Sequence, residues 1–204
     1  MRYLNALALA ALVVVPAARA QTDAPVDTAG FVSFQDPDGR FSLRVPPNWP
    51  IEPQHSDFCF GAGYADEGPS PTAAIANVFC DMEPTVVEGE TLTAADIVEL
   101  LSTRFGRATF MRTLGYGDAN DTSFAYLSHN LADLGGTPAV RIVYDLSMPV
   151  DPVADGPVVV LRSVMYLVPQ RDGGDPLNFN CGTTEPSTAL CDAVAGTFTS
   201  SARP

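Results

Sequence analysis

The feature that most constrains the fold is the apolar run from Val158 to Val168, the longest nearly continuous one after the first twenty residues. A run of this kind is typical of a central strand that is covered on both faces. A sheet covered on both faces needs helices or long loops on each side. The run therefore predicts an α+β chain with a layered core.

Other segments have the period of two that is typical of strands. Residues 31–34 and 41–45 are expected to form a hairpin, because Asp36-Pro37-Asp38-Gly39 between them is a turn signal. Further strands are expected at residues 56–64, 74–82, 123–128, 139–146 and 177–181. We expect these strands to form a largely antiparallel sheet.

Two amphipathic helices are expected to cover this sheet. The first begins at Thr93, which can cap the free amides, and Asp96 suits the positive end of the helix dipole. Gly106, between two arginines, is expected to mark its end. Its apolar face is predicted to contain Ile97, Leu100, Leu101 and Phe105. The second helix is expected to start near Pro186 and to present Leu190, Cys191, Val194 and Phe198 on one side.

Residues 1–20 have the three parts of a secretory signal peptide. Arg2 is the positive region, residues 4–15 are mostly apolar, and Ala18-Arg19-Ala20 is a small-x-small cleavage site. The apolar run is shorter than the roughly 20 residues that cross a bilayer. We therefore predict a soluble periplasmic or secreted protein without stable membrane insertion, with a flexible lead-in at residues 21–30 and a single domain at residues 31–204.

The four cysteines are an even number in an exported chain, which favours disulfides. Three pairings are possible, and we favour Cys59 with Cys80 and Cys181 with Cys191, because each pair lies on elements expected to be neighbours. A metal site is the alternative. It has little support, because no Cys-x-x-Cys occurs and neither histidine is at a ligand-like spacing from a cysteine pair.

The chain is strongly acidic. Its net charge is −13, and removal of the signal peptide, which has two arginines and no acid, changes this to −15. A negative surface repels phosphate backbones and anionic lipid, so nucleic acid is excluded as an expected partner. A cationic protein surface or a divalent cation is a better electrostatic match, and solubility alone is the simplest explanation.

The order of elements resembles that of the PsbP-like α/β/α sandwich. The resemblance rests on the hairpin from Phe34 to Leu43 and on Pro47-Asn48-Trp49 after it. It also rests on the helix after the fourth strand, on Gly136-Thr137-Pro138-Ala139, and on the final strand, helix and Phe198. Members include a photosystem II subunit, a Ran-binding nuclear-transport protein and bacterial envelope proteins. The resemblance implies a non-catalytic binding or assembly role, and it transfers no functional residue.

Two histidines are candidates for catalytic groups. His55-Ser56-Asp57 has the residue types of a hydrolase triad, but consecutive strand residues alternate faces and cannot converge. His129, expected in a loop at a strand end, could act as a general base if Asp133 or Asp121 oriented it. We favour a solvated loop histidine, because no nucleophile motif accompanies it.

Acidic loops are the candidates for cation binding. Asp36-Pro37-Asp38-Gly39 begins like a calcium loop but lacks the closing Glu, so we favour a simple turn. Asp151 and Asp155 lie in one loop, and Asp172 and Asp175 lie in another. These four carboxylates could gather a weak divalent cation, although solvated acids are the simpler interpretation.

Two aromatic residues are candidates for an interface, because aromatic side chains anchor interfaces out of proportion to their number. Trp49 could instead fill the core, which we favour, and Tyr116 could take either role.

The sequence thus predicts an exported, non-enzymatic binding or assembly module of the cell envelope that has no cofactor. Its expected partner is an envelope protein or a small ligand. The alternatives are a hydrolase that uses His129 with a loop acid and a divalent-cation binder.

Overall fold

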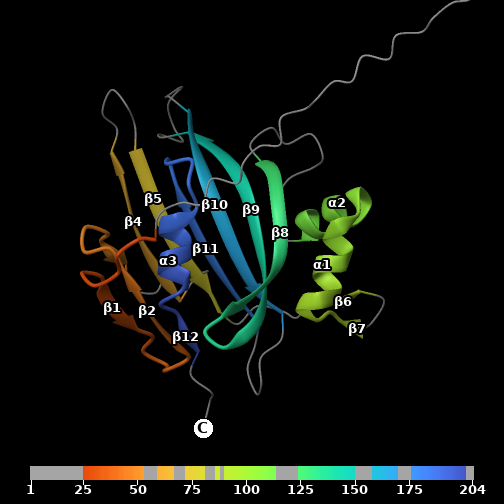
Figure 1. Ribbon diagram of the computed structural model, residues 1–204, viewed down its shortest axis with the longest axis horizontal. Coiled ribbons are helices and arrows are strands. Elements are labelled where there is room, and N and C mark those ends of the chain that lie inside the picture. The colour runs from red at the N-terminus through yellow and green to blue at the C-terminus, as the bar shows by residue number, and fades with distance from the viewer. Residues whose placement is uncertain are drawn as a thin grey trace, which may run out of the picture.

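The computed structural model describes residues 25–52, 59–66, 72–80, 86–87, 90–113, 124–149, 158–169 and 176–200. Its main element is a seven-stranded sheet with the strand order β3-β4-β5-β11-β10-β9-β8, in which every neighbouring pair is antiparallel (Figure 1). The strands are β3 (Ile51–Glu52), β4 (Phe60–Asp66), β5 (Thr72–Phe79), β8 (Phe124–Leu134), β9 (Thr137–Pro149), β10 (Val158–Val168) and β11 (Leu177–Thr183). The prediction of an α+β chain with a mostly antiparallel sheet is confirmed.

The expected N-terminal hairpin is present, but it belongs to a separate sheet. β1 (Val32–Gln35) and β2 (Phe41–Val45) are antiparallel, and β12 (Thr199–Ser200) pairs with the other edge of β2. Phe41 of β2 stacks on Phe198, with ring centroids 5.2 Å apart. The two ends of the described chain therefore meet in one small sheet. A further two-stranded element is formed by β6 (Val86–Val87) and β7 (Glu90–Thr91).

The long apolar run forms β10, which lies between β9 and β11 as the sequence predicted. It is buried from Ser163 to its end, but Val158 and Val160 are 63% and 50% exposed. The expectation of cover over the whole run is therefore wrong. The reason is that β11 pairs with β10 only from Arg162 onward, so the first residues of β10 have a strand on one side only.

Alternate residues of β10 belong to two different core clusters. Val164, Tyr166 and Val168 pack with residues of β2 and of α3 (Ala189–Ala195), such as Val194. Met165 and Leu167 pack in the other cluster, with Ile97 of α1 (Ala94–Ser102). Because neighbouring strand residues point to opposite faces, these two clusters lie on opposite sides of β10. Figure 1 shows α3 in front of β10 and β11, and α1 and α2 beside β8.

The first helix begins as predicted and ends earlier. Thr93 caps it, and its side chain and that of Asp96 form a reciprocal capping box. Thr103 is extended, which separates α1 from α2 (Arg104–Thr113). Phe105, expected on the buried face, is 83% exposed because the break changes the phase of the helix. Gly106, expected as the helix end, is instead buried within α2.

The C-terminal helix is shorter than expected but presents the expected face. α3 begins at Ala189 rather than near Pro186. Cys191 and Val194 are fully buried, and Leu190 is partly buried against the same cluster. Phe198 lies beyond the helix and still joins this cluster. α3 therefore packs through one apolar side, as an amphipathic helix does.

β8 is longer than predicted. A bulge between Tyr126 and Ser128 shifts the pairing with β9, so the period of two is lost in the sequence at this point. The strand continues to Leu134, where Gly135 and Gly136 turn the chain with φ of 61° and 86°. His129 is therefore inside an edge strand, and not in a loop at a strand end as expected.

Candidate functional site

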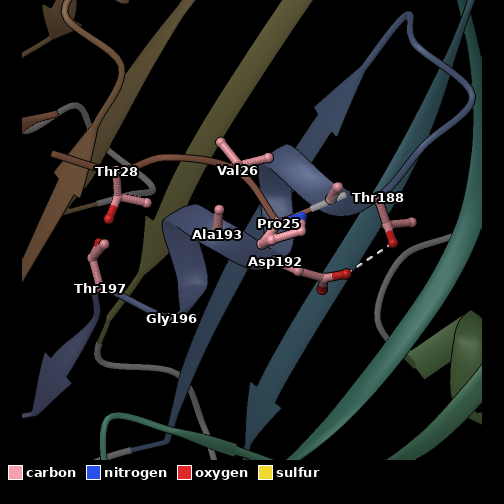
Figure 2. A pocket seen from close by; sticks show the side chains of 9 residues that line it. Pro25, Val26, Thr28, Thr188, Asp192, Ala193, Gly196 and Thr197 are labelled. Atoms are coloured by element: carbon pink, nitrogen blue, oxygen red, sulfur yellow. Dashed lines mark hydrogen bonds between the residues drawn. The ribbon is translucent and has the colours of Figure 1, made fainter. Parts of the chain in front are cut away.

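A groove runs between the N-terminal segment of the described chain and α3 (Figure 2). Its volume is about 580 Å³. One wall comes from residues 25–28, and the other comes from α3 and the turn after it. The lining residues are Pro25, Val26, Thr28, Thr188, Ala189, Asp192, Ala193, Gly196 and Thr197.

The α3 wall is low because its lining side chains are small. Ala189, Ala193 and Gly196 follow one another at four and three residues, which places them along one side of the helix. Gly196 has φ of −63°, so ordinary helical geometry, and not conformational freedom, explains its position. Such a strip lets another backbone approach α3 closely, as small residues do at helix interfaces.

The opposite wall is held in place by Arg44. Its guanidinium donates hydrogen bonds to the carbonyl oxygens of Thr28, Ala29 and Phe31 at 2.7, 3.2 and 3.3 Å. Thr197 also fastens the end of α3 to β2, because its hydroxyl accepts from the Arg44 amide at 2.8 Å and donates to the Val194 carbonyl of α3 at 2.7 Å. Both walls are therefore anchored through the same residue of β2.

An ionic network lies beneath the groove. The carboxylate of Asp192 accepts two hydrogen bonds from Arg141 of β9, at 2.8 and 2.7 Å. It also accepts from the hydroxyl of Tyr166 at 2.8 Å and from that of Thr188 at 2.8 Å, the contact drawn in Figure 2. Arg141 donates a further bond to Thr188 at 3.0 Å. The network joins α3 to two strands of the sheet.

Asp192, Arg141 and Tyr166 shift one another's pKa values through the hydrogen bonds and charges of this network. Burial raises the pKa of Asp192, but hydrogen bonds from Arg141 and Tyr166 outweigh it and leave the pKa below the ordinary value. Burial lowers the pKa of Arg141, and the bond to Asp192 more than restores it. Burial and then the Asp192 charge raise the pKa of Tyr166. Each group therefore holds one protonation state around neutral pH, which suits a structural link rather than proton transfer.

His129 is also occupied by contacts within the fold. Its Nε2 lies 3.1 Å from the carbonyl oxygen of Val98, which can only accept, so Nε2 carries the proton and donates. Nδ1 consequently accepts from the hydroxyl of Tyr126. The hydroxyl of Ser102 is 3.4 Å from Nε2 but donates to the same Val98 carbonyl at 2.9 Å. His129 therefore links β8 to α1.

This geometry does not assemble the hydrolase considered from the sequence. The nitrogen of His129 that faces Ser102 carries a proton, so it cannot accept one from the serine. Asp133 is four residues further along β8, at roughly 3.3 Å per residue, and it accepts a hydrogen bond from the Gly136 amide. Asp133 does not orient His129, and Asp121 lies outside the described residues.

The Asp36 turn is closed by an ion pair. Arg40 donates from Nε to Asp36 Oδ2 at 2.8 Å and from Nη2 to Oδ1 at 2.9 Å. The two residues are only 5% and 2% exposed. Burial raises the pKa of Asp36, but the bonds from Arg40 outweigh it and lower the pKa. Both carboxylate oxygens are engaged, which agrees with the turn interpretation and not with a calcium loop.

The cysteines are joined as Cys59–Cys80 and Cys181–Cys191, with Cα atoms 5.9 and 5.4 Å apart. These are the pairs that the sequence favoured. The first lies beside the β4–β5 pair, and the second fastens α3 to β11 next to Asp192. The groove therefore borders a helix that is held to the sheet by a disulfide and an ion pair.

Trp49 is 4% exposed and packs in the α3 cluster, so it is part of the core and not of an exposed surface.

Within the described part of the chain, no group of three or more His, Cys, Asp or Glu side chains could hold a metal ion, and no helix is long and apolar enough to cross a membrane. Several candidates lie outside the described residues, namely the signal peptide at residues 1–20, His55, Ser56, Asp57, Tyr116, Asp151, Asp155, Asp172 and Asp175.

The network beneath the groove was not among the sites predicted from the sequence. The sequence contains one indication of it. Asp192 directly follows Cys191 in a helix whose other predicted packing residues are apolar. Arg141 is likewise a cation between the apolar residues Val140 and Ile142 of β9. Charged residues are rarely buried unless they are paired, so the two could have been proposed as partners.

The fold and this groove define an α+β protein with a seven-stranded antiparallel sheet and a groove beside a disulfide-anchored helix. No protein-family model and no curated protein matches the chain.

The solved structures that are similar to the chain include the following two. One is cyanobacterial PsbP from Synechocystis, with 16% identity over 88% of this chain and 98% of that chain and a TM-score of 0.46. Another is LpqN, involved in cell envelope biogenesis of Mycobacterium tuberculosis, with 14% identity over 83% of this chain and 89% of that chain and a TM-score of 0.44. PsbP, whose family the order of elements in the sequence resembles, is thus among the structures similar to this chain.

Proposed function

We propose that this chain is an exported, non-enzymatic binding module of the cell envelope, built as one α/β/α sandwich over residues 31–204. Two disulfides support a location in an oxidising compartment outside the cytoplasm. The two core clusters on opposite sides of β10 support helical cover on both faces of the sheet. A signal peptide at residues 1–20 is the proposed route of export.

One observation carries the binding role. The described side chains best suited to chemistry, His129 and the Arg141–Asp192–Tyr166 network, are committed to bonds that connect helices to the sheet. The groove beside α3, in contrast, is open and offers small side chains. Binding needs shape and contact, whereas catalysis needs a reactive group aimed at the ligand.

The proposed occupant of the groove is an extended, neutral to basic segment of another envelope protein. The low strip of Ala189, Ala193 and Gly196 suits a backbone that lies along α3. The net charge changes from −13 to −15 when the signal peptide is removed, and it favours encounter with a cationic partner and disfavours an acidic one.

The test compares Ala193→Arg with Ala95→Arg. Ala193 lines the groove, whereas Ala95 is an exposed residue of α1 with the same side chain. Both variants add the same charge and volume. The mature protein and the two variants are used as bait in envelope extracts at matched ionic strength, and their melting temperatures are measured in parallel.

We expect the mature protein and Ala95→Arg to capture the same partner and Ala193→Arg to lose it, with both variants folded. Capture of that partner by Ala193→Arg at the level of the mature protein contradicts the proposed groove. If no variant of the set captures a specific partner, the binding role itself is rejected.

A further inference from the structure

The helix α2 carries positive charge, whereas the chain as a whole is acidic. α2 contains Arg104, Arg107 and Arg112 and no acid within its ten residues. The whole chain has 24 acidic residues and only 11 basic ones. The charge of α2 is therefore opposite in sign to the net charge of the chain.

One side of α2 fixes the helix to the fold. Phe110 is 2% exposed and packs in the core cluster of α1. Arg107 donates to the carbonyl oxygen of Leu101 at 2.9 Å, and its guanidinium lies 5.3 Å from the ring centroid of Tyr126 in β8. Figure 1 shows α2 beside β8, at one side of the molecule. α2 is thus held firmly and presents its other side to solvent.

The solvent side of α2 combines two arginines with an aromatic ring. Arg104, Ala108 and Arg112 follow one another at intervals of four residues, so they lie along one exposed side of the helix. Phe105, which is 83% exposed, is three residues before Ala108 and shares that side. At 1.5 Å per residue, the two arginines are about 12 Å apart along the helix axis. We call this surface the basic face, formed by Arg104, Phe105, Ala108 and Arg112.

Arg104 and Arg112 differ from the other arginines that the structure describes. The others are bound within the fold by aspartates or by backbone carbonyl oxygens, namely Arg40, Arg44, Arg107, Arg141 and Arg162. Among the described residues, no hydrogen bond or ion pair engages the side chain of Arg104 or of Arg112. Acids outnumber bases in this chain, so partners for an arginine are common. Two unpaired guanidiniums are therefore free to bind an anion from outside the fold.

The position of Arg104 also works against the helix. Arg104 is the first residue of α2, where the positive end of the helix dipole favours acids and disfavours cations. α1 has the ordinary arrangement, with Asp96 in its first turn. Local electrostatics therefore does not explain a basic start of α2 in an acidic chain. Departures of this kind from a local rule are expected at functional surfaces.

The chemistry of the basic face selects a polypeptide that is both acidic and apolar. Carboxylates form strong, often bidentate hydrogen bonds with guanidinium groups. Arginines and aromatic rings are also the residues that most often carry the binding energy of protein interfaces. A free phosphate ion cannot span about 12 Å between the two arginines, and it leaves Phe105 without a contact. We propose that the basic face binds an acidic segment of another protein, whose carboxylates pair with Arg104 and Arg112 and whose apolar side chain covers Phe105.

An anionic membrane fits the basic face less well. Asp96 and Glu99 are exposed on the adjoining helix α1. A lipid surface extends well beyond α2, so these carboxylates weaken its attraction to the arginines. One exposed phenylalanine also gives little apolar area to bury among lipid headgroups.

The net charge of the chain does not exclude an acidic partner at this place. Charges are screened over about 8 Å at physiological ionic strength, so the arginines of the basic face dominate once a segment lies against α2. A second copy of the chain is disfavoured, because it brings its whole net charge of −15 to the encounter. The basic face and the groove beside α3 thus select partners of opposite charge, which suits a module that joins two proteins.

Photo-crosslinking identifies the occupant of the basic face by its chemistry. A crosslinking amino acid replaces Ala108, between the two arginines, in cells that export the full chain, and the adduct is analysed by mass spectrometry. We expect an adduct with another protein, in which the crosslinked peptide has more Asp and Glu than Lys and Arg. An adduct with phospholipid, an adduct with a second copy of the chain, a peptide without excess acid, or no adduct overturns the proposal.

The crosslinked segment is then made as a synthetic peptide and titrated against the mature protein by calorimetry. One variant combines Arg104→Gln with Arg112→Gln, and a second is Phe105→Ala. The control combines Gln35→Glu with Asn48→Asp, which lowers the net charge by the same amount at exposed residues outside α2. All of these residues are exposed, so the melting temperatures should stay close to that of the mature protein.

We expect the dissociation constant to rise about tenfold or more in the double arginine variant and in Phe105→Ala, and to change by less than about twofold in the control. Equal affinity in all variants overturns the proposal. So does an equal loss in the control, because net charge alone then explains the binding. The adduct at position 108 should persist in Ala193→Arg, the groove variant, and its loss there contradicts a separate site on α2.

Discussion

Removal of the Asp192 carboxylate is the sharpest test of how the groove is supported. In Asp192→Ala, Arg141 loses two bonds, and the hydroxyls of Tyr166 and Thr188 each lose an acceptor. The side chain of Arg141 is only 18% exposed, so water replaces these bonds poorly. The variant should therefore be destabilised although no apolar contact is lost.

The expected size follows from burial. Removal of one partner of a fully buried ion pair costs about 3–5 kcal/mol. The side chain of Asp192 is 33% exposed, so solvent screening reduces this, and we expect a loss of about 2–3 kcal/mol in the free energy of unfolding. For a chain of this length the melting temperature should fall by roughly 5–10 °C.

The pH dependence gives a second readout. The pKa of Asp192 is lowered in the folded state, so its contribution is complete above its unfolded-state pKa of about 3.9 and is lost as the pH falls through the folded-state pKa. The difference between the mature protein and Asp192→Ala should therefore be large at neutral pH and should shrink at about pH 3.

Urea unfolding followed by circular dichroism, with the disulfides intact, measures these differences. Glu185→Ala is the control, because it removes the same charge from an exposed residue close to α3. A loss below about 0.5 kcal/mol in Asp192→Ala, which is ordinary for a surface substitution, refutes the structural role of the network. So does a loss that is equal at both pH values.

Four other variants test the helices and the disulfide by the same unfolding assay. Ile97→Ala should cost about 2–4 kcal/mol because Ile97 is fully buried, whereas Phe105→Ala should change stability by less than about 0.5 kcal/mol because Phe105 is 83% exposed; equal costs would contradict the break between α1 and α2. Gly106→Ala should lower the melting temperature, because its Cβ would lie 2.0 Å from a backbone carbonyl oxygen, and an unchanged value would refute that packing. Replacement of both Cys181 and Cys191 by alanine should cost about 2–4 kcal/mol, and a loss under about 1 kcal/mol would show that α3 needs no covalent anchor.

Local signals in the sequence predicted the elements whose physics is local. The turn at Asp36, the cap at Thr93 and the apolar face of α3 each depend on residues within a few positions of one another. Each of these features is present in the structure. The long apolar run, Val158 to Val168, likewise forms an inner strand of the sheet, because a strand that is buried on both faces consists mainly of apolar residues.

Local sequence patterns do not predict features that depend on residues far apart in the chain or on a break within an element. Phe105 looked buried because its spacing fits a continuous helix, but the extended Thr103 breaks that helix. His129 appeared to be in a loop because the bulge at Tyr126 interrupts the period of two. The network of Arg141 and Asp192 joins residues 51 positions apart, and no local pattern reports such a contact.

Photo-crosslinking in intact cells tests the central claim, a partner bound in the groove beside α3, most directly. A crosslinking amino acid is placed at Ala193 or, as the reference, at the exposed Ala95 of α1. The proposed function predicts one discrete adduct with an envelope protein from position 193 and none from position 95. The same pattern of adducts from both positions, or no adduct from position 193 in cells that export the folded protein, would contradict it.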